Sequence, residues 1–331
     1  MASIRPIALL CCFFACSLTS CTQKTVPYQP QAIDVREPKE GDLQQLTPDI
    51  AIPLEDPGYT LLLPRDTIKG LAVFFGSGRD TSDAGYEMRF YAEAARRQVA
   101  TLYVTTGRRI EFLFDADTAR YEQLDRYIGQ VLDTYPIPRG RLMFMGMSLA
   151  GTRAMKFGYW CLDGHSQYNI RPRAIAICDA PLDFFRFWRE GAFSIRYNTN
   201  PTSANEASWV NAQLEQHLGG TPEEVPEAYR RYSPYVKGAM ISPELERLKN
   251  VAVRAYTEPD VQWWMANRRK DYYGINALDA AGLANELHLL GNAEAELITT
   301  LDKGYRPDGS RHPHSWSIVD NGELVEWFLG L

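Results

Sequence analysis

Ser148 has neighbours that suit a nucleophilic serine. It follows an apolar run at Leu142–Met145 and precedes a stretch whose composition is compatible with a helix. A chain that passes from a buried strand into a helix within one residue strains its backbone at the turn, and it needs small residues there so that strand and helix can approach. Gly146, Ala150 and Gly151 meet that requirement. The spacing therefore predicts a serine hydroxyl at the apex of a sharp strand–turn–helix.

A serine hydroxyl is a poor nucleophile at neutral pH and needs a base that takes its proton. Two of the five histidines of the chain, His312 and His314, lie in the run Arg311–Trp316. This run comes after the last predicted strand and before a predicted terminal helix. Either imidazole could act as the base.

The base in turn needs a carboxylate that fixes its tautomer and stabilises the imidazolium. Glu258 and Asp260 follow the strand predicted at Val251–Tyr256. Asp179 and Asp183 follow the preceding predicted strand. The residues themselves leave these four carboxylates open as candidates.

From Tyr59 onwards, predicted strands alternate with predicted helices. Short apolar runs predict strands at Tyr59–Pro64 (a sheet edge), Gly70–Phe75, Val99–Val104, Leu142–Met145, Ala174–Cys178, Val251–Tyr256 and Glu296–Thr300. Helices are predicted at Ala84–Gln98, Ala116–Thr134, after Ser148, at Ala277–Leu290 and at Asn321–Phe328. Such alternation implies the α/β class, with a mainly parallel sheet and helices on both faces. Ligands bind beyond the carboxyl ends of such strands, and Ser148 lies at one of those ends.

From Tyr59 to Leu331 the chain resembles the α/β-hydrolase superfamily, which carries its triad in the order Ser, Asp, His. The segment Gly219–Tyr229, followed by Tyr232-Ser233-Pro234, is similar to one that precedes the acid strand in the prolyl-oligopeptidase-like and carbohydrate-esterase branches. The resemblance implies an α/β-hydrolase fold with a nucleophile elbow at Ser148.

The resemblance also ranks the candidates for base and acid. His314 is favoured over the alternative His312, because His-x-Trp ahead of a terminal helix resembles the esterase pattern. Asp260 matches the superfamily's aspartate best, and Glu258 is the alternative. The two carboxylates after the previous strand are a less usual third choice.

Two donors are expected for the oxyanion of the tetrahedral intermediate. In this superfamily one is the backbone N–H after the nucleophile, here Leu149, and the other comes from the loop after the Gly70–Phe75 strand. That loop reads Gly76-Ser77-Gly78 where relatives often carry His-Gly-Gly, so Ser77 is expected to donate. The resemblance implies no cofactor.

The implied reaction is the hydrolysis of carboxylic esters, of small molecules or of acyl groups on sugars, through an acyl-enzyme on Ser148. A peptidase or an acyltransferase could use the same residues. Peptidases of the related branch are gated by an N-terminal propeller, which we do not expect in this chain, so esters rank ahead of peptides. The alternative of another class is a non-catalytic lipoprotein that binds a glycan or a protein partner.

A long insertion at about 181–248 interrupts the alternation of strands and helices. It lies between two predicted sheet strands, and its first residues are rich in aromatic side chains. This placement predicts a lid or cap over the site, with an apolar or sugar-stacking face.

The N-terminus resembles a bacterial lipoprotein signal. Arg5 precedes an apolar run, Ile7–Leu18, that is too short to span a bilayer, and Leu18-Thr19-Ser20-Cys21 matches the cleavage pattern. The resemblance implies that residues 1–21 form the signal, that Cys21 is lipidated, and that the protein is held on a membrane of the bacterial envelope. The protein would face the periplasm or lie on the outer-membrane surface.

The rest of the sequence indicates how the chain is divided into domains and which partners are not expected. Residues 22–57 are rich in Pro, Gln, Asp and Glu and predict a tether, which leaves 58–331 for the hydrolase domain. A net charge of −6 without a basic run gives no reason to expect nucleic acid. Cys161 and Cys178 could pair or remain small core residues, and no Cys/His spacing suggests a metal site.

Overall fold

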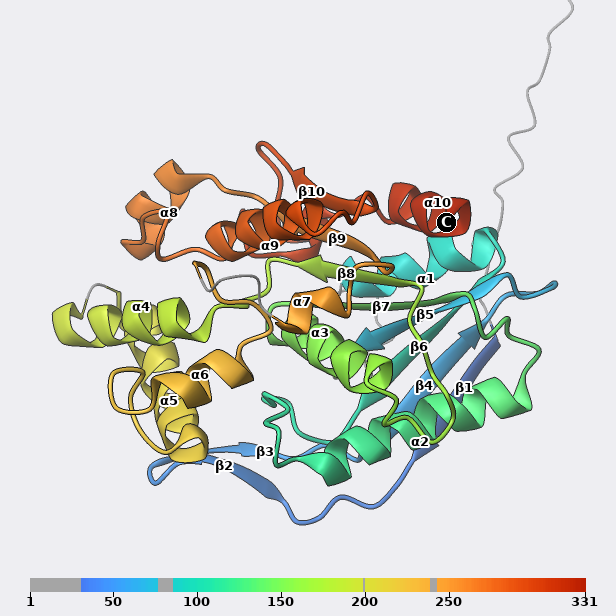
Figure 1. Cartoon of the computed structure of the whole chain (residues 1–331), viewed down its shortest axis with the longest axis horizontal. Helices are drawn as coiled ribbons and strands as arrows, with labels where there is room; N and C mark the ends of the chain where they lie inside the picture. The colour runs from blue at the N-terminus through green and yellow to red at the C-terminus, as the bar shows by residue number, and fades with distance from the viewer. Residues whose placement is uncertain (1–30, 77–85, 199, 239–242) are drawn as a thin grey trace, which may run out of the picture.

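The structure is a computed structural model that describes residues 31–76, 86–198, 200–238 and 243–331 (Figure 1). The predicted signal at 1–21, the lipidation site Cys21 and the expected oxyanion donor Ser77 lie outside these residues. The lipid anchor and the envelope location therefore stay predictions.

Within the described residues, the main sheet has eight strands in the order β1-β4-β6-β5-β7-β8-β9-β10. They are β1 (Gln31–Arg36), β4 (Gly58–Leu63), β5 (Gly70–Phe75), β6 (Val99–Thr105), β7 (Leu142–Met147), β8 (Ala174–Cys178), β9 (Ala252–Thr257) and β10 (Ala295–Thr299). The strands from β6 to β10 pair in parallel, and β4 and β1 continue the sheet in antiparallel pairing. The predicted, mainly parallel sheet is confirmed.

Helices cover both faces of this sheet. Along β5, Leu71, Val73 and Phe75 join one hydrophobic cluster, and the alternate residues Ala72 and Phe74 join another, as the period of a strand requires. The first cluster includes residues of α2 (Thr118–Thr134), α3 (Leu149–Leu162) and α9 (Ala277–Leu289). The second includes residues of α1 (Tyr86–Arg96) and α10 (Asn321–Gly330). The expected two-sided α/β architecture is therefore present.

The prediction of a tether at 22–57 is wrong for the part that the structure describes. Strand β1 pairs with β4 along its whole length, with Ile33 opposite Leu61, and Ile33 and Val35 pack on the core. A hairpin of β2 (Leu43–Thr47) and β3 (Ile50–Pro53) follows. Because β1 pairs with the outer side of β4, β4 has a neighbouring strand on both sides and is not the sheet edge that the sequence predicts.

The insertion is helical. It contains α4 (Phe184–Tyr197), α5 (Pro201–Leu218), α6 (Pro226–Tyr232) and the short α7 (Pro243–Glu246). Helices α4, α5 and α6 lie together at the left of Figure 1, below α8 (Val261–Arg268). Their aromatic side chains form a third cluster, in which Phe184, Tyr229 and Tyr232 are buried.

Cys161 and Cys178, the two cysteines of the described residues, are buried and form no disulfide with each other, so they are small core residues. None of the helices in the described ranges combines the length and apolar character needed to cross a bilayer.

Candidate active site

The turn between β7 and α3 has the geometry that the sequence predicts. Ser148 adopts φ +54° and ψ −132°, a left-handed conformation that a residue with a side chain rarely adopts. Its N–H donates to the carbonyl of Cys178 at 2.9 Å, and its own carbonyl accepts from Gly151 N–H at 2.9 Å. The turn thus holds a strained serine at the carboxyl end of β7, against the end of β8.

The small residues around Ser148 are required by contact distances. A Cβ atom on Gly146 would lie 2.4 Å from the carbonyl carbon and oxygen of Ala150. A Cβ atom on Gly151 would lie 2.8 Å from the Cβ of Ala180. Neither position can carry a side chain without moving the backbone of the turn or the loop after β8, so the steric basis of the prediction is confirmed.

His314 lies between β10 and α10, and its Nδ1 is 2.5 Å from Oδ2 of Asp179. An imidazole whose Nδ1 faces a carboxylate carries its proton on Nδ1, which leaves Nε2 as the free base. His314, Asp179 and Ser148 line one cavity of about 210 Å³. The structure therefore brings a strained serine, a histidine and a carboxylate to the same cavity.

Asp179 is the first residue after β8 and is only 5% exposed. Its backbone has φ +46°, its N–H donates to Tyr256 O at 2.8 Å, and its carbonyl accepts from Asn276 Nδ2 at 2.8 Å. Oδ1 accepts from the Thr257 hydroxyl at 3.3 Å, so Oδ2 is left for His314. The carboxylate is held by contacts on both its backbone and its side chain.

The prediction that Asp260 is the partner of the histidine is wrong. Asp260 caps α8, where Oδ1 accepts from Trp263 N–H at 3.0 Å, and Oδ2 lies 2.6 Å from Nη1 of Arg311. The Trp263 N–H and then the Arg311 guanidinium lower the pKa of the Asp260 carboxyl below its usual value. This aspartate is a helix cap and an ion-pair partner.

The alternative acid, Glu258, also has other partners. Its Oε2 accepts from the Thr300 hydroxyl at 2.7 Å and from Lys303 N–H at 3.1 Å, and Oε1 is 3.3 Å from Arg311 Nη2. Asp183, from the third-choice pair, caps α4 by accepting from Phe185 and Arg186 N–H groups. Of the four candidates, Asp179 is the one that contacts the histidine. The signal for it in the sequence is its place directly after the strand that neighbours β7.

His312, the alternative base, lies beside the favoured one. Its Nδ1 accepts from His314 N–H at 3.2 Å, and its Nε2 is 3.0 Å from Arg268 Nη2. Burial, followed by the charges of His314, Arg268 and Arg306, lowers the pKa of His312 to about 4. Its ring packs edge-on against Trp263 and Trp264. His312 is a neutral wall residue of the cavity at neutral pH, without a carboxylate partner among its hydrogen bonds.

Leu149, the expected oxyanion donor, is the first residue of α3. N–H groups in the first turn of a helix have no carbonyl partner within the helix, and the positive end of the helix dipole lies there. This placement fits the expected role of the Leu149 N–H as an oxyanion donor, which stays a prediction. The second expected donor, Ser77, is outside the described residues.

Helices α4 and α5 of the insertion contribute to the cavity wall. Phe187, Glu190 and Gly191 line it from α4, and Glu206 and Val210 line it from α5. Most of the aromatic residues that suggested an apolar lid pack instead in the third hydrophobic cluster. The wall is consequently mixed, with charged groups beside apolar ones.

The cavity wall includes cationic groups from α8 and the loop after it. Arg268 and Lys270 line it, and burial lowers the pKa of the Lys270 ammonium. Burial also raises the pKa of the Glu190 carboxyl on α4. In the ranges that the structure describes, no group of His, Cys, Asp and Glu side chains is arranged to hold a metal ion.

Solved structures share this architecture. An esterase from the hyperthermophilic archaeon Pyrobaculum calidifontis matches with a TM-score of 0.52 over 91% of this chain and 83% of its own, at 14% identity. A mutant of the esterase rPPE matches with a TM-score of 0.51 over 93% of this chain and 81% of its own, at 12% identity. At such identities the likeness shows the fold, and the fold of this chain is that of the α/β-hydrolases.

The acylaminoacyl peptidase of Pyrococcus horikoshii is a larger protein that contains a similar part. Its TM-score is 0.47 at 15% identity, and the match covers 91% of this chain and 40% of the peptidase. No protein-family model matches the sequence, and no curated protein matches it.

Proposed function

We propose that this chain is a serine hydrolase of carboxylic esters, with Ser148 as nucleophile, His314 as base and Asp179 as the acid that orients His314. The observation that carries the proposal is the 2.5 Å contact between His314 Nδ1 and Asp179 on a cavity that Ser148 also lines. A strained serine, a histidine with a fixed tautomer and a helix N-terminus together supply nucleophile, base and oxyanion donor.

The reaction begins when Nε2 of His314 takes the proton of the Ser148 hydroxyl. The serine oxygen attacks the ester carbonyl carbon, and the π electron pair moves onto the carbonyl oxygen, which accepts a hydrogen bond from Leu149 N–H. Collapse of this intermediate breaks the ester C–O bond, and His314 protonates the departing alcohol. Water then attacks the acyl-serine with His314 again as base, which releases the carboxylic acid and restores Ser148.

Ester substrates are preferred over peptides for two reasons. The two solved structures described above with TM-scores of 0.52 and 0.51 are both esterases. The sequence also resembles esterases in the His-x-Trp ahead of the terminal helix. The mixed wall of the cavity suits the ester of a small polar molecule or of a sugar, because it offers both apolar and charged contacts.

Labelling by a fluorophosphonate tests the proposal. This reagent forms a stable adduct with an activated serine, and intact mass with peptide mapping locates the adduct. We expect one adduct, on Ser148, and loss of labelling in Ser148→Ala and in His314→Ala. Ser208→Ala, which removes a hydroxyl that donates to Ala204 O within α5, is the control and should label like the wild type. A folded wild-type protein that stays unlabelled would overturn the proposal and favour a non-catalytic binding protein.

A further inference from the structure

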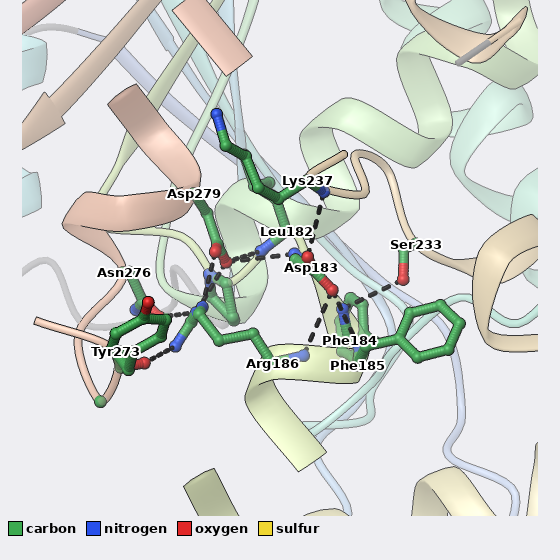
Figure 2. A network of polar contacts seen from close by, with 12 residues as sticks. Leu182, Asp183, Phe184, Phe185, Arg186, Ser233, Lys237, Tyr273, Asn276 and Asp279 are labelled. Atoms are coloured by element: carbon green, nitrogen blue, oxygen red, sulfur yellow. Dashed lines mark hydrogen bonds and ion pairs between the residues drawn. The ribbon is translucent and has the colours of Figure 1, made fainter. Parts of the chain in front are cut away.

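A buried ion pair joins the inserted helix α4 to the start of α9 (Figure 2). Nε of Arg186 lies 2.6 Å from Oδ1 of Asp279, and Nη2 lies 2.6 Å from Oδ2. The two side chains are 8% and 2% exposed. A bidentate pair with this little exposure fixes the relative position of both helices, because loss of either partner would leave a buried charge.

The same pair holds the loop that follows Asp179. Oδ2 of Asp279 also accepts from the backbone N–H groups of Leu182 and Asp183, at 2.9 and 3.1 Å (Figure 2). The Asp279 carboxylate thus accepts from Arg186 and from two backbone donors of the loop. The far end of the 179–183 loop is fixed in this way.

Asn276, the residue before α9, holds the near end of the loop. Its Nδ2 donates to the carbonyl of Asp179 at 2.8 Å, and its Oδ1 accepts from Arg186 Nη2 at 3.0 Å. Arginine only donates, so the amide atom that faces it must be the oxygen. The NH₂ group of Asn276 is thereby turned towards Asp179. Arg186 orients the amide, and the amide holds the backbone of Asp179.

That backbone needs external support. Asp179 has φ +46°, a left-handed conformation that is strained for a residue with a side chain and persists when the surroundings determine it. Rotation about the N–Cα bond of Asp179 would relieve this φ and move the carboxylate that faces His314 relative to the backbone. The peptide before Asp179 is held by its N–H bond to Tyr256 O, so the contact from Asn276 to the Asp179 carbonyl holds the second flanking peptide and opposes this rotation.

We propose that Arg186 and Asn276 are positioning residues that hold the Asp179 carboxylate against His314. The inference rests on the proposed function. It gives α4 two roles. The helix carries Arg186, and its residues Phe187, Glu190 and Gly191 line the cavity.

Asn276→Asp separates positioning from folding. The new carboxylate still accepts from Arg186, but it cannot donate to the carbonyl of Asp179. We expect kcat for an ester to fall about 100-fold, as for a reacting group displaced by about 1 Å, with KM within about threefold of the wild type. The one-dimensional proton spectrum gives a readout besides activity. The downfield resonance of the His314 Nδ1 proton, which reports its contact with a carboxylate, should shift upfield or disappear.

Asn292→Asp is the matched control. Asn292 is 3% exposed, and its Nδ2 donates to the carbonyls of Leu248 and Val251 at 2.7 and 2.9 Å, away from the cavity residues. We expect it to lose stability and to keep both kcat and the downfield resonance.

Three results would overturn the positioning role. They are an Asn276→Asp enzyme with kcat within about threefold of the wild type, an unchanged downfield resonance in that variant, or an equal loss of kcat in both variants. A wild type that neither labels nor cleaves esters would instead overturn the proposed function, and the resonance would still test the positioning of Asp179.

Discussion

The loops after β8 and β9 offer two versions of the same feature. Each ends a parallel strand at the same edge of the sheet and presents carboxylates there. The loop after β8 places Asp179 against His314, whereas the loop after β9 places Glu258 and Asp260 against Arg311. The two loops therefore differ in the group that faces the carboxylate.

That difference is the basis of the roles that we propose for the two loops. A carboxylate opposite a guanidinium is held ionised by a cation that does not titrate, so it serves stability. A carboxylate opposite an imidazole that lines a cavity with a serine can stabilise a charge that forms and disappears during turnover. Position after a strand is thus shared by both loops and does not by itself identify the proposed acid; the partner of each carboxylate distinguishes them.

The largest expected effect comes from exchanging carboxylates for amides in the two loops. Asp179→Asn should lower kcat about 10⁴-fold, because the amide can hold the wrong tautomer of His314. Asp260→Asn and Glu258→Gln should leave kcat within about threefold, since their partner is Arg311. Steady-state kinetics on one ester measures all three variants. If Asp260→Asn lost as much activity as Asp179→Asn, the comparison of the two loops would fail.

Removal of Arg311, the cation that Glu258 and Asp260 share, should lower the stability of the loop after β9 and not that of the loop after β8. Arg311→Met leaves the Glu258 side chain, which is 1% exposed, without its cation. We expect the free energy of unfolding in urea to fall by about 3 kcal/mol, the usual result of breaking a buried pair from one side. The activity of the folded variant should change less than tenfold.

Arg189→Met is the control for this loss. Its ion pair with Glu223 is exposed on both sides, at 59% and 56%, and the variant should stay within about 0.5 kcal/mol of the wild type. A loss of kcat in Arg311→Met as large as that in Asp179→Asn would place the loop after β9 in the catalytic machinery.

Much of the sheet and the serine turn could be predicted because their requirements are local. Strands buried on both faces form continuous apolar runs, as at Gly70–Phe75 and Ala174–Cys178. The elbow requires small residues at fixed positions, and Gly146 and Gly151 are where a side chain would collide.

Features that depend on a distant partner could not be predicted in the same way. Strand β1 is an edge strand with mostly exposed or half-exposed residues, so its sequence lacks an apolar run, and pairing with β4 alone makes it a strand. The carboxylate that contacts His314 could not be predicted for the same reason. Asp179 and Asp260 both follow strands, and the contact with His314 is made by chain packing across more than a hundred residues.

The smallest expected effect is a change in the free energy of unfolding when the charge of Asp260 is removed. Asparagine caps a helix about as well as aspartate, so Asp260→Asn keeps the cap of α8 and removes the ionic part of its contact with Arg311. The pKa of Asp260 is lower in the folded protein than its unfolded value near 3.9. The ionised carboxylate therefore stabilises the fold at pH values above about 3.9, and this contribution is lost as the pH falls through the lower folded-state pKa.

Urea unfolding at a series of pH values measures this contribution. We expect the wild type to exceed Asp260→Asn by about 0.5–1 kcal/mol between pH 5 and 7, because the Asp260 side chain is partly exposed and solvent screens the pair. The difference should shrink as the pH falls below about 3.9 and through the lower folded-state pKa of Asp260. Glu223→Gln, which alters an exposed pair, should match the wild type throughout. A difference in the free energy of unfolding between the wild type and Asp260→Asn that did not change with pH would mean that helix capping or packing causes it. The charge opposite Arg311 would then not distinguish the loop after β9 from the loop that carries Asp179.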